Sequence, residues 1–180
     1  GRNRLLKRPQ GVYKTMFEQQ GHRFEQTEQQ LIVQGALKAG SYEIDGSISS
    51  QFITGLLFAL LLLEQDSIIH IKPPFESRSY IELTLQMLKT FGVTAEFQDN
   101  HTLYIPGNQS YQVCDYTVEG DYSQMAFYAV LAAIQSDLYC KGITSSSKQG
   151  DKAILSILEA CNCKIEPKQE GYLVHKSELT

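Results

Sequence analysis

"DGSISSQFITGLLFALLLLEQ", residues 45–65, places a serine-rich polar turn directly before a nearly unbroken apolar run. The run from Phe52 to Leu63 has twelve residues and includes Thr54 and Gly55. A membrane-spanning helix needs roughly 18 or more apolar residues, so this run is too short to cross a bilayer. A short helix that is apolar on all sides is typically buried on all sides. We therefore expect a core helix whose polar N-terminal end is available to a ligand.

The composition of the 180 residues is that of an ordinary globular protein, with 42% hydrophobic and 20% charged residues. The net charge of −4 and the pI near 5.6 argue against a nucleic-acid partner, because no global basic field is present. One local cluster of positive charge stands at the start of the chain and consists of Arg2, Arg4, Lys7 and Arg8. Composition alone favours a solvated basic end, and the alternative is a clamp for a small anion.

Four cysteines lie in the last third of the chain: Cys114, Cys140, Cys161 and Cys163. Their spacing matches neither a CxxC motif nor a zinc site, so we interpret them as buried, reduced thiols and expect no metal and no cofactor. The basic N-terminal cluster is followed by polar sequence, which is not the pattern of a signal peptide. Both observations predict a cytoplasmic location and no membrane partner.

A pattern of amphipathic helix, Gly or Asn stop, strand, polar turn and strand occurs three times. It covers residues 10–35, 80–107 and 151–176. Phe17, Leu88 and Leu158 occupy the same place in the pattern, at offsets of 71 and 70 residues. Gly and Asn adopt the left-handed conformation that ends a helix at little cost. A regular spacing of this length indicates a duplicated supersecondary unit.

A second pattern of strand, turn, apolar helix and short strand occurs twice, beginning at Tyr42 and at Tyr116. Together the two patterns predict an α/β (α+β) fold built from repeated β-α-β-α-β-β units. About two and a half copies are present: a partial unit at 1–40, a complete unit at 41–110 and a complete unit at 111–180. A partial unit cannot bury its faces alone, so we expect that residue 1 is not the natural start and that the chain is a piece of a larger protein.

Two polar turns are the candidate sites of ligand binding, because helix N-termini carry unpaired N–H groups and partial positive charge. In "GSISSQ", Ser49 and Ser50 add hydroxyl donors and Gln51 adds an amide. In "SRSY", Ser77 and Tyr80 open the next helix, which can begin at the same end of the sheet. The alternative for each turn is simple helix capping, and the residues alone leave the two readings equal for the first turn.

Nucleophilic catalysis is disfavoured by the same turn, since it lacks the second glycine of a G-x-S-x-G elbow. The histidines, which are candidates for a general base, are scattered: His22, His70, His101 and His175. No Walker motif is present. We therefore expect no catalytic nucleophile in this chain.

With these motifs in hand, the chain resembles the enolpyruvyl transferases, and within that family the branch that acts in the shikimate pathway. The matching stretches are "KRP" at 7–9, "DGSISSQF" at 45–52, "SRSYIELTLQMLKTFGV" at 77–93 and "VEGDYSQ" at 118–124. The resemblance covers nearly the whole chain. It implies an inside-out barrel type of fold with six such units in two globular halves. Residues 1–110 would be the later part of one half, and residues 111–180 the first unit of the other.

The resemblance also implies which residues bind substrate. Shikimate 3-phosphate would be held by Ser49, Ser50, Gln51, Ser77 and Tyr80, with the serine hydroxyls directed mainly at its phosphate. Phosphoenolpyruvate would be held by Arg8, with Gln51 between the two substrates. Arg2 and Arg4 depart from the family, whose members often carry an acidic residue and a serine at those positions.

In the reaction that the resemblance implies, the enolpyruvyl group of phosphoenolpyruvate moves to the 5-hydroxyl of shikimate 3-phosphate, and phosphate is released. The carboxylates and lysines that transfer protons in the family have no counterpart in this chain. We therefore expect no catalytic residue in residues 1–180, an inactive fragment, and a full-length protein that is monomeric.

Two other functions stay open, and a more distant third, an RNA-end-processing enzyme with similar units, would need a basic RNA-binding face that this acidic chain does not indicate. The sibling enzyme that transfers enolpyruvate to UDP-N-acetylglucosamine is disfavoured by the paired serines and by "SRSYIEL". A non-catalytic ligand-binding or scaffold module would keep the repeat without the chemistry. The residues flanking this segment would separate the alternatives.

Overall fold

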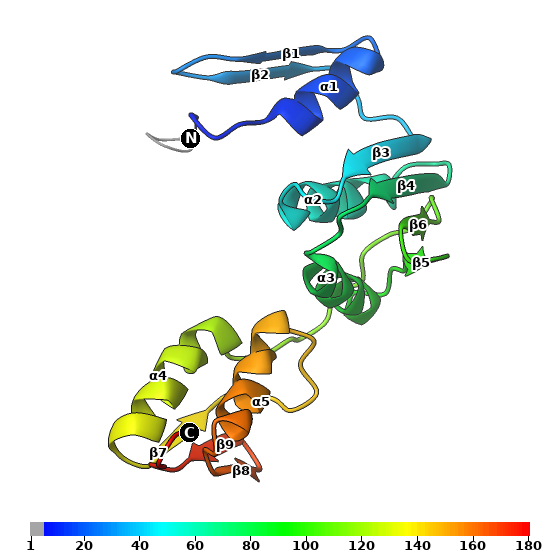
Figure 1. Cartoon of the computed structure of the whole chain (residues 1–180). Coiled ribbons are helices and arrows are strands. Elements are labelled where there is room, and N and C mark those ends of the chain that lie inside the picture. The colour runs from blue at the N-terminus through cyan, green and yellow to red at the C-terminus, as the bar shows by residue number, and fades with distance from the viewer. Residues whose placement is uncertain (1–5) are drawn as a thin grey trace. The chain divides into compact units, whose positions relative to one another are not determined.

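The computed structural model describes residues 6–180 (Figure 1), so Arg2 and Arg4 of the basic cluster lie outside the described residues. The chain divides into two compact bodies, Gly1–Cys114 and Asp115–Thr180. Helices and strands occur in both, which confirms the predicted mixed α/β class. The assignment of the two bodies to different halves of a larger enzyme stays a prediction.

The first body opens with a helix and a hairpin: α1 (Gly11–Gln19), β1 (Arg23–Gln26) and β2 (Leu31–Gln34). The strands pair antiparallel. Gly21 has a φ of 77°, the left-handed conformation that lets the chain leave α1 and turn into β1. The ring of the buried Phe24 packs 6.0 Å from that of Phe17, which fastens the hairpin to the helix. Residues 11–34 therefore form the predicted helix and two strands.

A complete β-α-β-α-β-β sequence follows in the same body. Its elements are β3 (Ser41–Asp45), α2 (Ser50–Leu60), β4 (Ser67–Lys72), α3 (Arg78–Thr90), β5 (Glu96–Phe97) and β6 (Thr102–Ile105). The sheet order is β3-β4-β6-β5, with β3 parallel to β4 and the other pairs antiparallel. Burial alternates along β3 and β4, so one face of the sheet packs against α2 and α3 (Figure 1).

The apolar helix α2 is not buried on every side, and in this respect the prediction is wrong. Ile53, Leu57 and Leu60 are fully buried, but Phe58 is 46% exposed. The sheet, α3 and the side chain of Tyr13 from α1 cover the rest of the helix. Its outer side is covered only in part, where the Tyr111 hydroxyl donates to the Phe58 carbonyl at 3.1 Å.

The second body contains two helices and an antiparallel sheet of three strands. Its elements are α4 (Tyr122–Gln135), β7 (Leu138–Lys141), the 3₁₀ turn η2 (Gly150–Lys152), α5 (Ala153–Ala160), β8 (Ile165–Lys168) and β9 (Gly171–Val174). The sheet order is β7-β9-β8. Its core centres on Tyr122, Ala129 and Val174, which are fully buried.

The prediction of a complete repeat at 111–180 is wrong in its first element, because residues 109–121 form no strand. In β3, Tyr42 and Ile44 are buried beneath helices. The corresponding Tyr116 and Val118 are 43% and 82% exposed. Without apolar burial, nothing offsets the conformational entropy that strand formation would remove.

The four cysteines are free thiols, as expected, but only Cys163 is buried and the other three are half-buried. Chain placement explains this, because Cys163 alone of the four lies within the core of the second body. Among residues 6–180, no helix has both the length and the apolar character that a bilayer-spanning segment requires. In the same residues, no group of three or more His, Cys, Asp or Glu side chains could hold a metal ion.

Candidate substrate-binding site

The topology of the first body brings the starts of α2 and α3 to one edge of its sheet. Parallel β3 and β4 end at the same edge, and each is followed directly by its helix. The N–H of Gly46 donates to the carbonyl of Lys72 at 2.9 Å, which extends the pairing beyond the strands. We call this region, residues 45–51 and 72–80, the helix-start edge.

Gly46 allows the two loops of the helix-start edge to touch. A Cβ at this position would lie 2.5 Å from the carbonyl oxygen of Lys72 and 2.6 Å from that of Pro74. Both distances are far below ordinary contact, and both neighbours are backbone atoms that cannot turn away. The glycine therefore fixes how closely the start of α2 approaches the loop before α3.

The turn before α2 is organised by its own side chains. The Asp45 carboxylate accepts hydrogen bonds from the Ser47 N–H at 2.9 Å and from the Ser47 hydroxyl at 2.6 Å. These bonds, the hydroxyl first, hold the pKa of Asp45 below its usual range. Ser49 is the N-cap of α2 and its oxygen accepts from the Gln51 N–H at 3.4 Å, so capping is confirmed for Ser49. Its O–H proton is not used by that bond and can still be donated to an anion.

The start of α3 differs, because its N-cap serine is not used as a cap. Ser77 occupies the N-cap position, but its side chain makes no capping hydrogen bond. Its Oγ is buried and has no hydrogen-bond partner among residues 6–180. A buried hydroxyl without a partner costs about 1–3 kcal/mol. An orphaned donor at a helix N-terminus is suited to an anionic oxygen.

The neighbours of Ser77 on α3 have different roles. The Arg78 guanidinium lies 2.8 Å from the Glu82 carboxylate and 4.2 Å from the centre of the Phe97 ring, and it donates to the Asn100 carbonyl at 2.9 Å. Arg78 therefore packs α3 against the sheet. Tyr80, in the first turn of α3, is 47% exposed.

The segment that carries Arg8 is held beside the start of α2. The Gln26 amide donates to the carbonyls of Leu6 and Arg8 at 2.6 and 2.8 Å. In the first turns of α1, the Tyr13 hydroxyl donates to the Phe52 carbonyl of α2 at 3.1 Å. The N-terminal end of α1 therefore lies against the N-terminal end of α2, and the exposed Arg8 precedes it.

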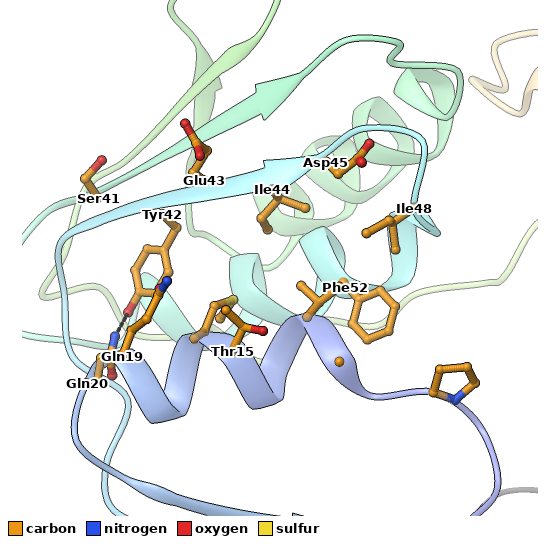
Figure 2. Close-up of a pocket in the computed structure, with 14 residues that line it drawn as sticks. Thr15, Gln19, Gln20, Ser41, Tyr42, Glu43, Ile44, Asp45, Ile48 and Phe52 are labelled. Atoms are coloured by element: carbon orange, nitrogen blue, oxygen red, sulfur yellow. Dashed lines mark hydrogen bonds between the residues drawn. The ribbon is translucent and has the colours of Figure 1, made fainter.

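A cavity of about 820 Å³ separates α1 from β3 and reaches the start of α2. Figure 2 shows Thr15, Tyr42 and Phe52 pointing into it. The Gln20 amide donates to the Tyr42 hydroxyl at 2.8 Å at one end. Asp45, together with Pro9 beside Arg8, belongs to the lining. The cavity therefore adjoins both the helix-start edge and the basic segment.

The structure thus places every candidate residue at the N-terminal end of one of three neighbouring helices. Arg8 precedes α1; Ser49, Ser50 and Gln51 open α2; Ser77 and Tyr80 open α3. The sequence reasoning missed the Asp45 turn, which the Asp-x-Ser spacing could have indicated. It also missed a contact between Thr54 and Thr84, which no local signal reveals.

A sequence profile of EPSP synthase (3-phosphoshikimate 1-carboxyvinyltransferase) matches residues 1–180. The chain belongs to this family. The 3-phosphoshikimate 1-carboxyvinyltransferase of Clostridium perfringens (strain ATCC 13124) is 45% identical over 175 residues, 96% of this chain and 41% of the relative. That of Clostridium kluyveri is 40% identical over 182 residues, 100% of this chain and 43% of the relative. The chain therefore spans about two fifths of the length of these relatives.

Solved EPSP synthase structures have the same fold over almost the whole chain. A structure from Acinetobacter baumannii at 2.37 Å matches with a TM-score of 0.72 and 20% identity, covering 98% of this chain and 41% of the other. Another structure of the enzyme from that organism matches with a TM-score of 0.70. At this identity the likeness establishes the fold of the EPSP synthase family for this chain and nothing about its ligands.

Proposed function

We propose that this chain is the substrate-binding part of an EPSP synthase that acts in the cytoplasm as a monomer. The complete enzyme would transfer the enolpyruvyl group of phosphoenolpyruvate to the 5-hydroxyl of shikimate 3-phosphate. The C–O bond to phosphate breaks, and the products are 5-enolpyruvylshikimate 3-phosphate and inorganic phosphate. Membership of the family supports this chemistry, and the length of the chain relative to its relatives supports a partial role.

The orphaned hydroxyl of Ser77 is the observation that carries the proposal. It lies at the start of α3, at the sheet edge where α2 also begins. The oxygens of a phosphate there would accept from Ser49 and from the unpaired N–H groups of both helix starts. They would also accept from Ser77, once rotation of this half-buried side chain brought its buried hydroxyl to the surface. Such charge-assisted bonds are about twice as strong as neutral ones.

The six proposed residues would bind and orient rather than transfer protons. Ser49, Ser50 and Ser77 would hold the phosphate of shikimate 3-phosphate. Arg8 would hold phosphoenolpyruvate, because its planar fork matches a carboxylate or phosphate. Serine, glutamine, arginine and tyrosine side chains are poor general acids and bases at neutral pH. Their contribution is the proximity of two reactants, which lowers the barrier by fixing their geometry.

The test is a calorimetric titration of shikimate 3-phosphate into the protein and its Ser77→Ala variant. Loss of one hydrogen bond to a charged group removes about 1.5–3 kcal/mol, so the dissociation constant should rise roughly 10- to 100-fold. The melting temperature should not fall, since the Ser77 hydroxyl has no hydrogen-bond partner to lose in the part of the chain that the structure describes.

Three results would contradict the proposal. Equal affinity of S77A and the unchanged protein would remove Ser77 from the site. Binding of UDP-N-acetylglucosamine in place of shikimate 3-phosphate would favour the sibling transferase. Failure to bind either acceptor would favour a non-catalytic module.

A further inference from the structure

Two threonine hydroxyls meet between α2 and α3. The Oγ1 atoms of Thr54 and Thr84 lie 3.1 Å apart. The Thr84 hydroxyl also donates to the Tyr80 carbonyl at 2.9 Å. Thr84 is only 9% exposed and Thr54 is half-buried, so the contact is largely shielded from water.

The direction of these bonds follows from the number of protons. A threonine hydroxyl has one proton, and that of Thr84 is used at the Tyr80 carbonyl. In the contact between the two threonines, Thr54 must therefore be the donor. A continuous path of two hydrogen bonds runs from Thr54 on α2 through Thr84 to Tyr80 in the first turn of α3.

The pair lies one helical turn from the helix-start edge on both helices. Thr54 follows Ser50 by four residues, and Thr84 follows Tyr80 by four, so each threonine lies on the same helix face as its partner. A change in the separation of the two threonines would be transmitted directly to the first turns of α2 and α3. These turns carry the proposed phosphate contacts.

Stability does not explain a hydroxyl pair at this place. Ile53, which precedes Thr54, and Ile81, three residues before Thr84 on α3, are fully buried and apolar. Replacing both partners of a buried hydrogen bond by apolar groups of similar shape is often nearly neutral. A directional bond, unlike an apolar contact, sets the relative position of two helices.

The second body carries no such pair at the equivalent positions of its helices. Alignment of "SSQFIT" with "YSQMAF" and of Leu88 with Leu158 puts Phe127 and Ile154 in place of the two threonines. There the serine that corresponds to Ser77, Ser147, is bonded within the protein. The hydroxyl pair therefore occurs in the repeat whose N-cap serine has no hydrogen-bond partner within residues 6–180.

We infer that Thr54 and Thr84 are positioning residues, which hold the starts of α2 and α3 at the separation that spans one phosphate group. The inference deepens the proposed function and rests on it. Neither threonine touches substrate. They act through Ser50 and Tyr80, by fixing the turns to which these residues belong.

The experiment compares Thr54→Val, Thr54→Ser and Thr90→Val. T54V removes the bond between the helices, while the Thr84 proton stays paired with Tyr80, so little stability should be lost. Thr90 is the control for the Thr-to-Val change itself, because its hydroxyl bonds within its own helix, to the Gln86 carbonyl at 3.1 Å, at the far end of α3. Calorimetry measures the dissociation constants of shikimate 3-phosphate and of unphosphorylated shikimate, and thermal unfolding measures stability.

T54V should weaken shikimate 3-phosphate binding about tenfold, with a smaller effect on shikimate, because the phosphate contacts are displaced. T54S should restore the affinity, and T90V should bind like the unchanged protein. The inference would be overturned if T54V bound shikimate 3-phosphate as tightly as the unchanged protein does. It would also be overturned if T54V lost affinity for both shikimate 3-phosphate and shikimate in proportion to a lower melting temperature. If S77A weakens binding and T54V does not, only this inference fails; if neither does, the proposed function fails with it.

Discussion

Residues 41–110 and the second body, Asp115–Thr180, have equivalent polar groups at the starts of their helices, but they use them differently. An acidic residue followed by glycine precedes the first helix in each, as Asp45-Gly46 and as Glu119-Gly120. A serine precedes the second helix in each, as Ser77 and as Ser147, 70 residues apart. Gly46 and Gly120 also make the same kind of hydrogen bond, to the carbonyls of Lys72 and Gly142.

In the second body these groups bond to one another. The Ser147 hydroxyl donates to the Glu119 carboxylate at 2.8 Å, and the Gln149 amide donates to the same oxygen at 3.0 Å. The Gln149 side-chain carbonyl accepts from the Tyr122 N–H at 2.9 Å, which satisfies the start of α4. The serine and the helix start are therefore satisfied without a ligand.

In residues 41–110 the corresponding carboxylate turns the other way. Asp45 bonds to Ser47 within its own turn, and the Ser77 hydroxyl is left unpaired by the described residues, 6–180. Aspartate is one methylene shorter than glutamate, and its reach suits a bond two residues along the chain. The same arrangement of strands and helices can therefore leave the polar groups of a helix start bonded to one another or available to a ligand. The difference depends on which group a single carboxylate bonds to.

Alanine in place of the shared glycines should give the largest effect. Gly46→Ala places a Cβ against two backbone oxygens, and we expect a loss of about 3 kcal/mol in the free energy of unfolding. Gly120→Ala meets the Gly142 carbonyl and the flexible end of Ile143, both at 2.7 Å, so about 2 kcal/mol should be lost. Urea denaturation measures both values.

The two glycine variants should also differ in ligand binding. G46A separates the loops of the helix-start edge and should abolish detectable binding of shikimate 3-phosphate, whereas G120A should leave its affinity unchanged. Equal losses of affinity in G46A and G120A would show that ligand binding is not confined to the helix starts of residues 41–110.

Alanine at Ser147 should lower stability and leave ligand affinity unchanged, which is the reverse of the effect expected for alanine at Ser77. Ser147→Ala removes a buried hydroxyl that bonds to Glu119 and accepts from the Gln149 N–H, and we expect a loss of about 1–2 kcal/mol in stability. Shikimate 3-phosphate should bind as before. Ser145→Ala, at an exposed neighbouring serine, is the control and should change neither quantity. If S147A were as stable as the unchanged protein but bound shikimate 3-phosphate more weakly, the ligand-binding role would belong to Ser147 and not to Ser77.

The smallest expected effect concerns acid stability in the second body. Hydrogen bonds from Lys164 and then Lys168, both at 2.8 Å, lower the pKa of Glu166 from 4.5 to about 2. A carboxyl whose pKa is lower in the folded state stabilises the protein above its ordinary pKa. That contribution is lost as the pH falls from 4.5 through 2.

Glu166→Gln should therefore flatten the fall of the melting temperature between pH 4.5 and pH 2, and have little effect below that range. Thermal unfolding over a pH series measures the difference. Parallel curves for E166Q and the unchanged protein would exclude this carboxyl as a source of acid sensitivity, and added salt should reduce the effect because the group is exposed.

Local sequence signals predicted most of the fold. Apolar spacing located α1, α3 and α5, and Gly21, Gly92 and Asn162 mark their ends with positive φ values. The missing strand before α4 was not predictable in this way, because "YTVEG" has the same alternation as "YEIDG". Whether such a stretch forms a strand depends on apolar cover from segments distant in sequence.

For the candidate site, the sequence by itself determined which residues stand at the helix starts, because capping and turn preferences act within a few residues. Only the tertiary structure decided which serine is left unpaired and which is bonded to a carboxylate. It also decided that Thr54 and Thr84 meet, 30 residues apart in sequence. The physical reason is that hydrogen-bond partners are set by distances of a few tenths of an ångström between elements, and these distances depend on the packing of the whole core.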